Sequence, residues 1–351
     1  MRRALLFYTL FLSLLWTSQA EAQSDEAKKF FAENVIVDGL CFPYYRPGST
    51  LHRFPRQEDG TFDMGDYRNG TGVDLAVWDI RRPEEMKKMV SAVEKGHFTN
   101  TVIIRRYEDI ETMSNTGQHG WLFHTQHPWP LQGTTAPIEG WHRDGLRMVQ
   151  LVYGSNISVP SSDRLGTGSS SGDDETSGLT PLGKDVVATC NRLGIIVDVS
   201  HCNRQTTLDA CATSCMPITS THAGCDAITP ARRNKTDDEI RAIAKTGGVF
   251  GITPIKFMIN DSGKGATMEH FIAHLEHAIN VAGIDHVGIA SDLKRNGVPE
   301  SETVAYCCPE LNGEQRWFHL YEALRAKGYT DEDLAKIFGK NFLRVFEKVL
   351  R

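Results

Sequence analysis

Gly194-Ile-Ile-Val-Asp-Val-Ser-His201 and Pro217-Ile-Thr-Ser-Thr-His222 are two short apolar runs, and each ends in a histidine. Runs of this length and composition are typical of buried parallel strands. A third run, His286-Val-Gly-Ile-Ala-Ser-Asp292, ends in a carboxylate. Barrel enzymes carry their chemistry at the carboxyl ends of such strands. The three segments therefore predict a site where His201, His222 and Asp292 converge on a metal ion or a substrate.

Strand candidates of this kind recur along the whole chain and alternate with helical patterns. They number eight: residues 35–38, 73–78, 121–125, 148–153, 195–200, 218–221, 249–253 and 287–290. Strands that alternate with helices pair in parallel, and eight such units favour a single closed (β/α)8 barrel of the TIM type. A doubly wound open sheet is the alternative. Residues 101–115 fit either a strand or the start of a helix.

Helix signals support this order. Thr180-Pro181 is an N-cap followed by proline at the first helical position, and the helix it opens ends at Leu193-Gly194. Acidic residues at 237–239 begin another helix, which ends at the glycines 247–248. Apolar residues at helical spacing predict two last helices over 315–327 and 331–350, which we expect in the outer ring of the barrel.

The first 22 residues have the layout of a secretory signal peptide. Arg2 and Arg3 precede an uncharged apolar run over 4–16 and a small-residue region over 17–22. The run is too short to span a bilayer, and no later stretch is long and apolar enough to do so. A buried N-terminal helix is the alternative. We therefore expect residues 23–351 to form the barrel domain of an exported, periplasmic or extracellular protein without a membrane span.

Net charge and cysteine content limit which partners and which disulfide chemistry the chain can have. The net charge of −6 disfavours nucleic acid and anionic membranes as partners. Eight cysteines in an exported chain permit disulfides, but their spacing defines no disulfide scaffold. Cys41, Cys202 and Cys225 lie near predicted strand ends, and we interpret them as buried thiols or disulfide partners.

Two long polar segments leave the predicted carboxyl face of the barrel. Residues 155–178 contain almost no core-forming side chains, and they fit either a lid over the barrel mouth or a plain disordered insertion. Residues 296–312 form a second polar loop on the same face.

Several motifs occur in one order along most of the chain. They are Gly178-Leu-Thr-Pro-Leu-Gly183, Asn191-Arg-Leu-Gly-Ile-Ile-Val-Asp-Val-Ser-His201, Ser220-Thr-His222, Arg232-Arg-Asn-Lys-Thr-Asp-Asp238, Gly283-Ile-Asp-His-Val-Gly-Ile-Ala-Ser-Asp292 and Asn341-Phe-Leu-Arg-Val-Phe346. Together they resemble the membrane (renal) dipeptidase family of zinc metallopeptidases. The agreement of ordered motifs is more specific than any one of them.

The resemblance implies a barrel of the metallo-dependent hydrolase type that holds two zinc ions and hydrolyses dipeptides with a free carboxylate. It also implies a homodimer. By position, His201 and His222 correspond to the ligands of one zinc, and Asp292 to the catalytic carboxylate that takes the proton of the attacking water. Arg233 corresponds to the clamp for the substrate carboxylate. These residue types suit the chemistry, because neutral imidazole binds zinc and guanidinium binds carboxylate in a fork.

The chain departs from the family pattern in its first strand and at two later positions. Where the family has Asp-Gly-His-x-Asp, this chain reads Asp38-Gly-Leu-Cys-Phe42, so Leu40 and Phe42 replace two metal ligands. The bridging glutamate of the family falls at Gln126. The family histidine after the fourth strand falls near Ser155, and we assign the neighbouring Tyr153 and Asn156 to substrate binding.

Leucine and phenylalanine cannot bind a metal, and an amide is a poor zinc bridge. We therefore expect one divalent metal, most simply zinc, rather than two. His201, His222 and Asp292 would hold it, and water or Gln126 would supply the remaining ligand. Replacement ligands are also conceivable: Asp38, His119, His124 and His127.

Three functions fit this sequence. The first is a metal-dependent hydrolase of dipeptides or of similar small amides that carry a carboxylate. The second is a non-catalytic protein that binds a small acid on a degenerate dipeptidase scaffold. The third is a mononuclear amidohydrolase that acts on a lactone or a cyclic amide.

Overall fold

The computed structural model describes residues 23–42, 62–63, 70–126, 131, 133–153, 177–260, 262, 265–294, 303 and 306–351. The expected signal peptide, most of the polar segment 155–178 and part of the segment 296–312 lie outside these residues. So do two predicted site residues, His127 and Asn156.

All eight predicted strands are present and pair in parallel. They are β1 (Val37–Phe42), β3 (Leu75–Asp79), β6 (His119–Thr125), β7 (Leu146–Gln150), β8 (Ile196–Asp198), β9 (Ile218–Ala223), β10 (Val249–Ile252) and β11 (Val287–Ile289). Hydrogen bonding joins them in the order β11-β10-β9-β8-β7-β6-β3-β1-β12. The last of these, β12 (Leu293–Lys294), follows β11 in the chain and pairs with β1. The ladder thus returns to its start, and the sheet is a (β/α)8 barrel rather than an open sheet.

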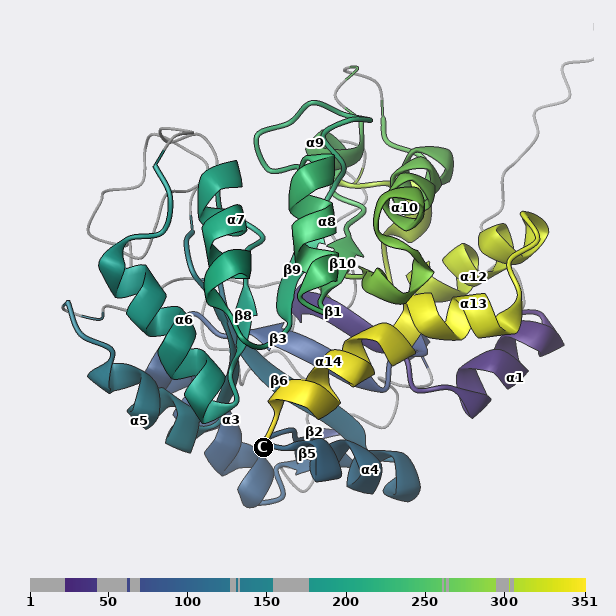
Figure 1. The fold of residues 1–351 in the computed structure, drawn as a ribbon. Coiled ribbons are helices and arrows are strands. Elements are labelled where there is room, and N and C mark those ends of the chain that lie inside the picture. Colours follow the sequence, from purple (N-terminus) through teal and green to yellow (C-terminus); the bar gives the residue numbers. More distant parts are fainter. Residues whose placement is uncertain are drawn as a thin grey trace, which may run out of the picture.

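Helices surround the strands (Figure 1). They are α1 (Asp25–Glu33), α3 (Pro83–Glu94), α4 (Tyr107–Thr116), α5 (Ala136–Asp144), α6 (Pro181–Leu193), α7 (Arg204–Thr213), α8 (Asp237–Lys245), α9 (Lys256–Ile259), α10 (Met268–Ala282), α12 (Arg316–Ala326), α13 (Asp331–Ala335) and α14 (Asn341–Val349). Short strands β2 (Phe62–Asp63), β4 (Phe98–Thr99) and β5 (Thr101–Ile103) add to the sheets. Single turns at Ile284–His286, Pro309–Leu311 and Lys336–Lys340 complete the elements. Among the described helices, none is long and apolar enough to cross a membrane.

The predicted helix ends are confirmed. Thr180 caps α6, since its hydroxyl accepts from the Gly183 amide, and Gly194 ends this helix with a φ of 74°. Thr236 and Glu239 form a capping box at the start of α8. The ambiguous region 101–115 contains both predicted elements, because β5 pairs with the first residues of β6 and α4 follows it.

Side chains alternate between the two faces of each strand, and this alternation separates two apolar clusters. Leu75 and Val77 of β3 belong to an inner cluster, whereas Trp78 belongs to the outer cluster beneath the surrounding helices. Neighbouring strands contribute to the inner cluster in the same way: Leu122, Met148 and Ile196. The inner cluster also contains Phe342 and Phe346 of α14.

Helix α14 therefore closes the amino end of the barrel, which corrects the expectation that it belongs to the outer ring. Arg344 donates to the carbonyls of Gly247 and Asp285, which precede β10 and β11. Gly288 leaves room for the Phe342 ring, because a Cβ there would lie 2.5 Å from a ring carbon. Because α14 has one strongly apolar face, it is better suited to cover the amino end of the barrel than to lie in the exposed outer ring.

On four strands, the residue two positions after an apolar residue of the inner cluster is buried and polar. These residues are Asp79, His124, Gln150 and Asp198. Because residues i and i+2 of a strand share one face, these side chains also point into the barrel. A polar layer thus lies at the carboxyl ends, above an apolar layer and the α14 plug. All eight cysteines lie in the described residues, and no disulfide joins any of them.

Candidate functional site

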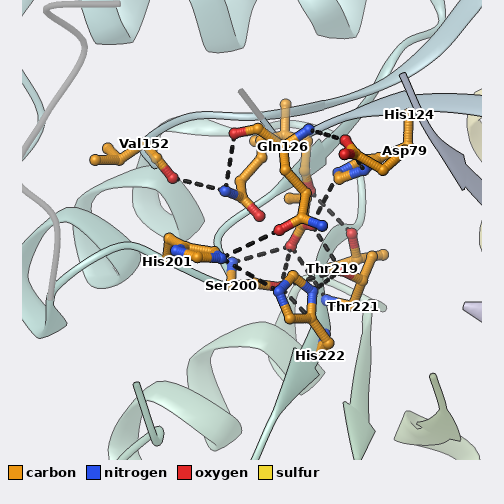
Figure 2. A network of polar contacts seen from close by, with 12 residues as sticks. Asp79, His124, Gln126, Val152, Ser200, His201, Thr219, Thr221 and His222 are labelled. Atoms are coloured by element: carbon orange, nitrogen blue, oxygen red, sulfur yellow. Dashed lines mark hydrogen bonds and ion pairs between the residues drawn. The ribbon is translucent and has the colours of Figure 1, made fainter. Parts of the chain in front are cut away.

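Asp198 is a buried member of the polar layer at the carboxyl ends of the strands, and its partners His124, Ser200 and Thr221 are labelled in Figure 2. One carboxylate oxygen accepts from the Thr221 hydroxyl at 2.7 Å and lies 3.1 Å from His124 Nε2. The other accepts from the Ser200 hydroxyl at 2.6 Å and from the amides of Ser200 and Thr221. Burial opposes ionisation, but these partners, His124 first, lower the pKa of Asp198 far below its usual range. Asp198 is therefore a fixed, buried anion.

The hydrogen bonds of Thr221 define the tautomer of His222. Thr221 gives its only hydroxyl proton to Asp198, so the contact of 2.8 Å with His222 Nδ1 requires that His222 donate from Nδ1. The lone pair of His222 then lies on Nε2. Burial, together with Arg233, keeps the pKa of His222 well below its usual value, so the ring is neutral. A neutral imidazole held from its other nitrogen is the form that binds a metal.

His201 faces this lone pair. The Nε2 atoms of His201 and His222 are 3.3 Å apart, and the Gln126 amide oxygen lies 3.2 Å from His201 Nε2. The Tyr153 ring stacks on His201 with centroids 4.6 Å apart. The structure thus brings together three of the predicted metal ligands, His201, His222 and Gln126, with Tyr153 beside them.

Gln126 is held by two other strands of the barrel. The Gln126 backbone N–H donates to an Asp79 carboxylate oxygen at 2.7 Å, and the Gln126 backbone carbonyl accepts from the Gln150 side chain at 3.1 Å. Asp79 lies 3.9 Å from Nδ1 of His124 through the same oxygen. In Figure 2, Asp79 and His124 lie on one side of the network and His201 on the other, with Gln126 between them. The polar layer therefore fixes the backbone from which the Gln126 side chain reaches the histidine pair.

Arg233 and Asp292 supply opposite charges near the histidine pair. Arg233 is only 5% exposed, and its nearest described acceptor is the His222 carbonyl, 3.5 Å from Nη2. Its Nε has no hydrogen-bond partner among the described residues. Burial lowers the pKa of Arg233 to about 10, against the opposing effect of Asp292. A buried guanidinium with donor capacity to spare suits a carboxylate ligand.

Asp292 lies between β11 and β12, where the barrel closes. Its φ of 49° is left-handed, and its amide donates to the Leu40 carbonyl at 2.9 Å. Burial raises the pKa of Asp292 to about 7; Arg233 opposes this rise, and the carboxylates of Asp79, Asp38 and Asp198 add to it. An aspartate in the left-handed conformation that favours glycine, with a pKa near neutrality, is a candidate proton acceptor.

The first strand retains one carboxylate. Asp38 is buried and accepts from the Ser291 amide at 2.7 Å. Burial raises its pKa to about 6, although the Arg316 charge and the Ser291 hydrogen bonds lower it. Leu40 is fully buried on the same strand, and Phe42 ends it. No metal donor therefore stands at the two positions where the resemblance implies a histidine and an aspartate.

One expectation is corrected by the geometry. Within the described residues, no three His, Cys, Asp or Glu side chains lie close enough together to hold a metal ion. His201 and His222 meet, but Asp292 does not complete a three-residue cluster with them. The described cation that interacts with Asp292 is Arg233. His119 begins β6 and thus lies at the amino end, away from the site.

Sequence reasoning missed four residues that hold the site together: Asp79, Asp198, Ser200 and Thr221. Asp198 carried a usable signal, since it stands inside an apolar strand two residues after an inward apolar position. A buried carboxylate in that register requires donors from neighbouring strands. The donors themselves come from segments distant in the sequence.

Comparison with known proteins agrees with this architecture. Residues 22–351 match the family model described as membrane dipeptidase (peptidase family M19). The dipeptidase tcpJ of Claviceps purpurea (strain 20.1) is 28% identical over 243 residues, which span 69% of this chain and 54% of that relative. The chain therefore spans about half the length of that curated relative.

Solved structures show the same fold. The probable dipeptidase PvdM from Pseudomonas aeruginosa superposes with a TM-score of 0.74 at 20% identity, over 93% of this chain and 98% of that one. A metallopeptidase from Rhodobacter sphaeroides, liganded with a phosphinate mimic of the dipeptide L-Ala-D-Ala, gives 0.71 at 19% identity, over 90% and 99%.

Proposed function

Because this chain belongs to the membrane dipeptidase family, we propose that it is an exported, metal-dependent hydrolase that cleaves the amide bond of dipeptides or of similar small amides bearing a carboxylate. The observation that carries the proposal is the His201–His222 pair, with Nε2 atoms 3.3 Å apart, together with Arg233, which contacts the His222 carbonyl and interacts with Asp292. Export is supported by the sequence of residues 1–22, and a homodimer by the family resemblance.

The donor set supports one divalent metal rather than two. His222 is neutral with its lone pair on Nε2, and His201 Nε2 lies 3.3 Å from that atom and 3.2 Å from the Gln126 side-chain oxygen. Such a set is suited to zinc. A second ion would need donors where Leu40 and Phe42 stand. We therefore propose one zinc ion per chain, held by His201 and His222 with Gln126 as a weak third donor.

The residues divide the reaction between them. When bound, the metal supplies Lewis acidity to the scissile carbonyl and to the attacking water. Arg233 holds the substrate carboxylate in a charge-assisted contact. Asp292 accepts the proton of the water and returns it to the leaving amine, because a carboxyl with a pKa near 7 can do both near neutral pH. Tyr153 covers one face of the His201 ring and limits where the substrate lies.

Metal analysis combined with a hydrolysis screen tests this proposal. Purified protein should contain about one equivalent of zinc after incubation with excess metal and desalting. It should also hydrolyse at least one member of a dipeptide panel that includes L-Ala-D-Ala, and a phosphinate mimic of that dipeptide should inhibit it. Two stoichiometric zinc ions would contradict the single-metal proposal.

The loss of first-strand ligands favours a second candidate, a non-catalytic protein that binds a small acid through Arg233. This candidate predicts that the phosphinate binds while no dipeptide is cleaved, with or without zinc. Hydrolysis of lactones or cyclic amides, with no dipeptide cleaved, would instead point to a mononuclear amidohydrolase.

A further inference from the structure

Lys235 is a buried cation that the mechanism above does not use. Its side chain is 1% exposed, and its ammonium group has three partners: the Cys202 carbonyl at 2.7 Å, the Thr207 hydroxyl at 2.8 Å and a Glu239 carboxylate oxygen at 3.2 Å. The first two contacts are hydrogen bonds and the third is an ion pair, which compensates the ammonium charge. A lysine so buried is rare unless it is paired.

The first two partners belong to the segment that carries His201. Cys202 directly follows His201, and Thr207 lies in the first turns of α7, which begins two residues later. The Thr207 hydroxyl also donates to the Asn203 carbonyl. Lys235 thus holds the peptide that leaves His201 against the start of α7.

The backbone of Lys235 belongs to the segment that follows His222. Its amide donates to the Gly224 carbonyl at 3.0 Å, and its carbonyl accepts from the Asp226 amide at 2.9 Å. These bonds close the loop from 225 to 235 at its base. Within the loop, Arg233 reaches the His222 carbonyl, and Asn234 accepts from the Gly224 amide at 2.9 Å.

One residue therefore connects the two halves of the site. Its backbone is fixed to the segment that carries His222 and Arg233, and its ammonium group is fixed to the segment that carries His201. Helices α7 and α8, which bear Thr207 and Glu239, lie side by side (Figure 1). Partners outside the ligand sphere commonly set the orientation of metal ligands.

We propose that Lys235 is a positioning residue that sets His201 against His222 and Arg233, and so determines the metal affinity of the histidine pair. This inference rests on the proposed metal-dependent function. The pairing with Glu239 explains why the cation can be buried there, since both side chains are almost fully enclosed.

The test replaces the ion pair without leaving an unpaired charge. Lys235→Met keeps the length of the side chain, and Glu239→Gln retains an oxygen for the Thr236 capping box while removing the charge. The matched control is Arg147→Met. Arg147 is likewise a buried cation that donates to backbone carbonyls, those of His142, Leu146 and Arg105, but it stands near the amino end of β7.

Two measurements are made on the parent, the double variant and the control. Zinc affinity, from competition with a chromophoric chelator, should fall about 10- to 100-fold in the double variant and stay unchanged in the control, even where both lose thermal stability. Amide hydrogen exchange of the metal-free proteins should accelerate over residues 201–207 in the double variant alone.

The zinc-affinity and hydrogen-exchange measurements test the role of Lys235 separately from the proposed metal-dependent function. If the parent binds no zinc, the metal-dependent function fails, and the exchange measurement alone decides whether Lys235 holds the His201 segment. Equal zinc affinity in parent and double variant, or exchange over 201–207 no faster than in the control, overturns the role of Lys235.

Discussion

Replacing Arg233 with alanine is the most direct test of the substrate pocket. The guanidinium is 5% exposed, and its Nε has no described partner, so a substrate carboxylate would meet a desolvated cation with donors available. Its contact with the His222 carbonyl is long, at 3.5 Å, and contributes little by itself. The substitution therefore removes mainly the carboxylate contact and the charge beside Asp292.

The size of the effect follows from the contact that is lost. A charge-assisted hydrogen bond contributes about 1.5–3 kcal/mol, which corresponds to roughly a ten- to hundredfold loss in kcat/KM or in affinity for the phosphinate. Arg233→Lys should recover only part of this loss, because an ammonium group cannot reproduce the planar fork. Arg233 also opposes the raised pKa of Asp292, so the alanine variant should need a higher pH for full activity.

The assay is kcat/KM for the best dipeptide, measured against pH, beside calorimetric binding of the phosphinate. The neighbouring Arg232 is exposed and serves as the control, since Arg232→Ala changes the net charge equally without altering the site. If Arg233→Ala binds and turns over substrate like Arg232→Ala, Arg233 is not the carboxylate clamp. For a dipeptide amide without a free carboxylate, Arg233→Ala should change only the pH dependence of kcat/KM and not its value at the pH optimum.

Three further outcomes follow. In metal-free protein, the raised pKa of Asp292 contributes stability that is fully present below pH 3.8 and is lost as the pH rises through about 7. Urea unfolding should thus show Asp292→Asn gaining roughly 1–3 kcal/mol on the parent between pH 5 and 8. His124→Leu removes a donor from the buried Asp198 and should cost about 2–4 kcal/mol in the same assay. His201→Ala and His222→Ala should each abolish stoichiometric zinc, with thermal unfolding checking that the fold persists.

The barrel was predictable because each strand carries its own signal. Short β-branched runs separated by capped helices define parallel units without any knowledge of their partners, and all eight predicted runs are strands. The position of α14 at the amino end of the barrel was not predictable in the same way. Its apolar face fits a rim helix and a barrel plug equally well, and the choice depends on the space that Gly39 and Gly288 leave for Phe342.

The sequence predicted the two histidines of the site but not the residues that orient them. His201 and His222 end apolar strands, and that pattern is visible in the sequence. The orientation of their rings depends on Asp198, Thr221 and Lys235, whose partners lie on other strands and helices. Period-two alternation places Asp198 inside the barrel, but only the closed sheet shows that Thr221 and His124 supply its donors.

The raised pKa values of Asp38 and Asp292 indicate that the site would bind a positive ion favourably. Four carboxylates, those of Asp38, Asp79, Asp198 and Asp292, interact at the carboxyl end of the barrel, and each of the first three raises the pKa of Asp292. Arg233 is the described cation that opposes this effect most strongly. A divalent ion at the neutral histidine pair would relieve the same repulsion and displace protons, which couples metal binding to the ionisation of Asp292. The single ion proposed above would lie beside this excess negative charge, and the charge would favour its binding.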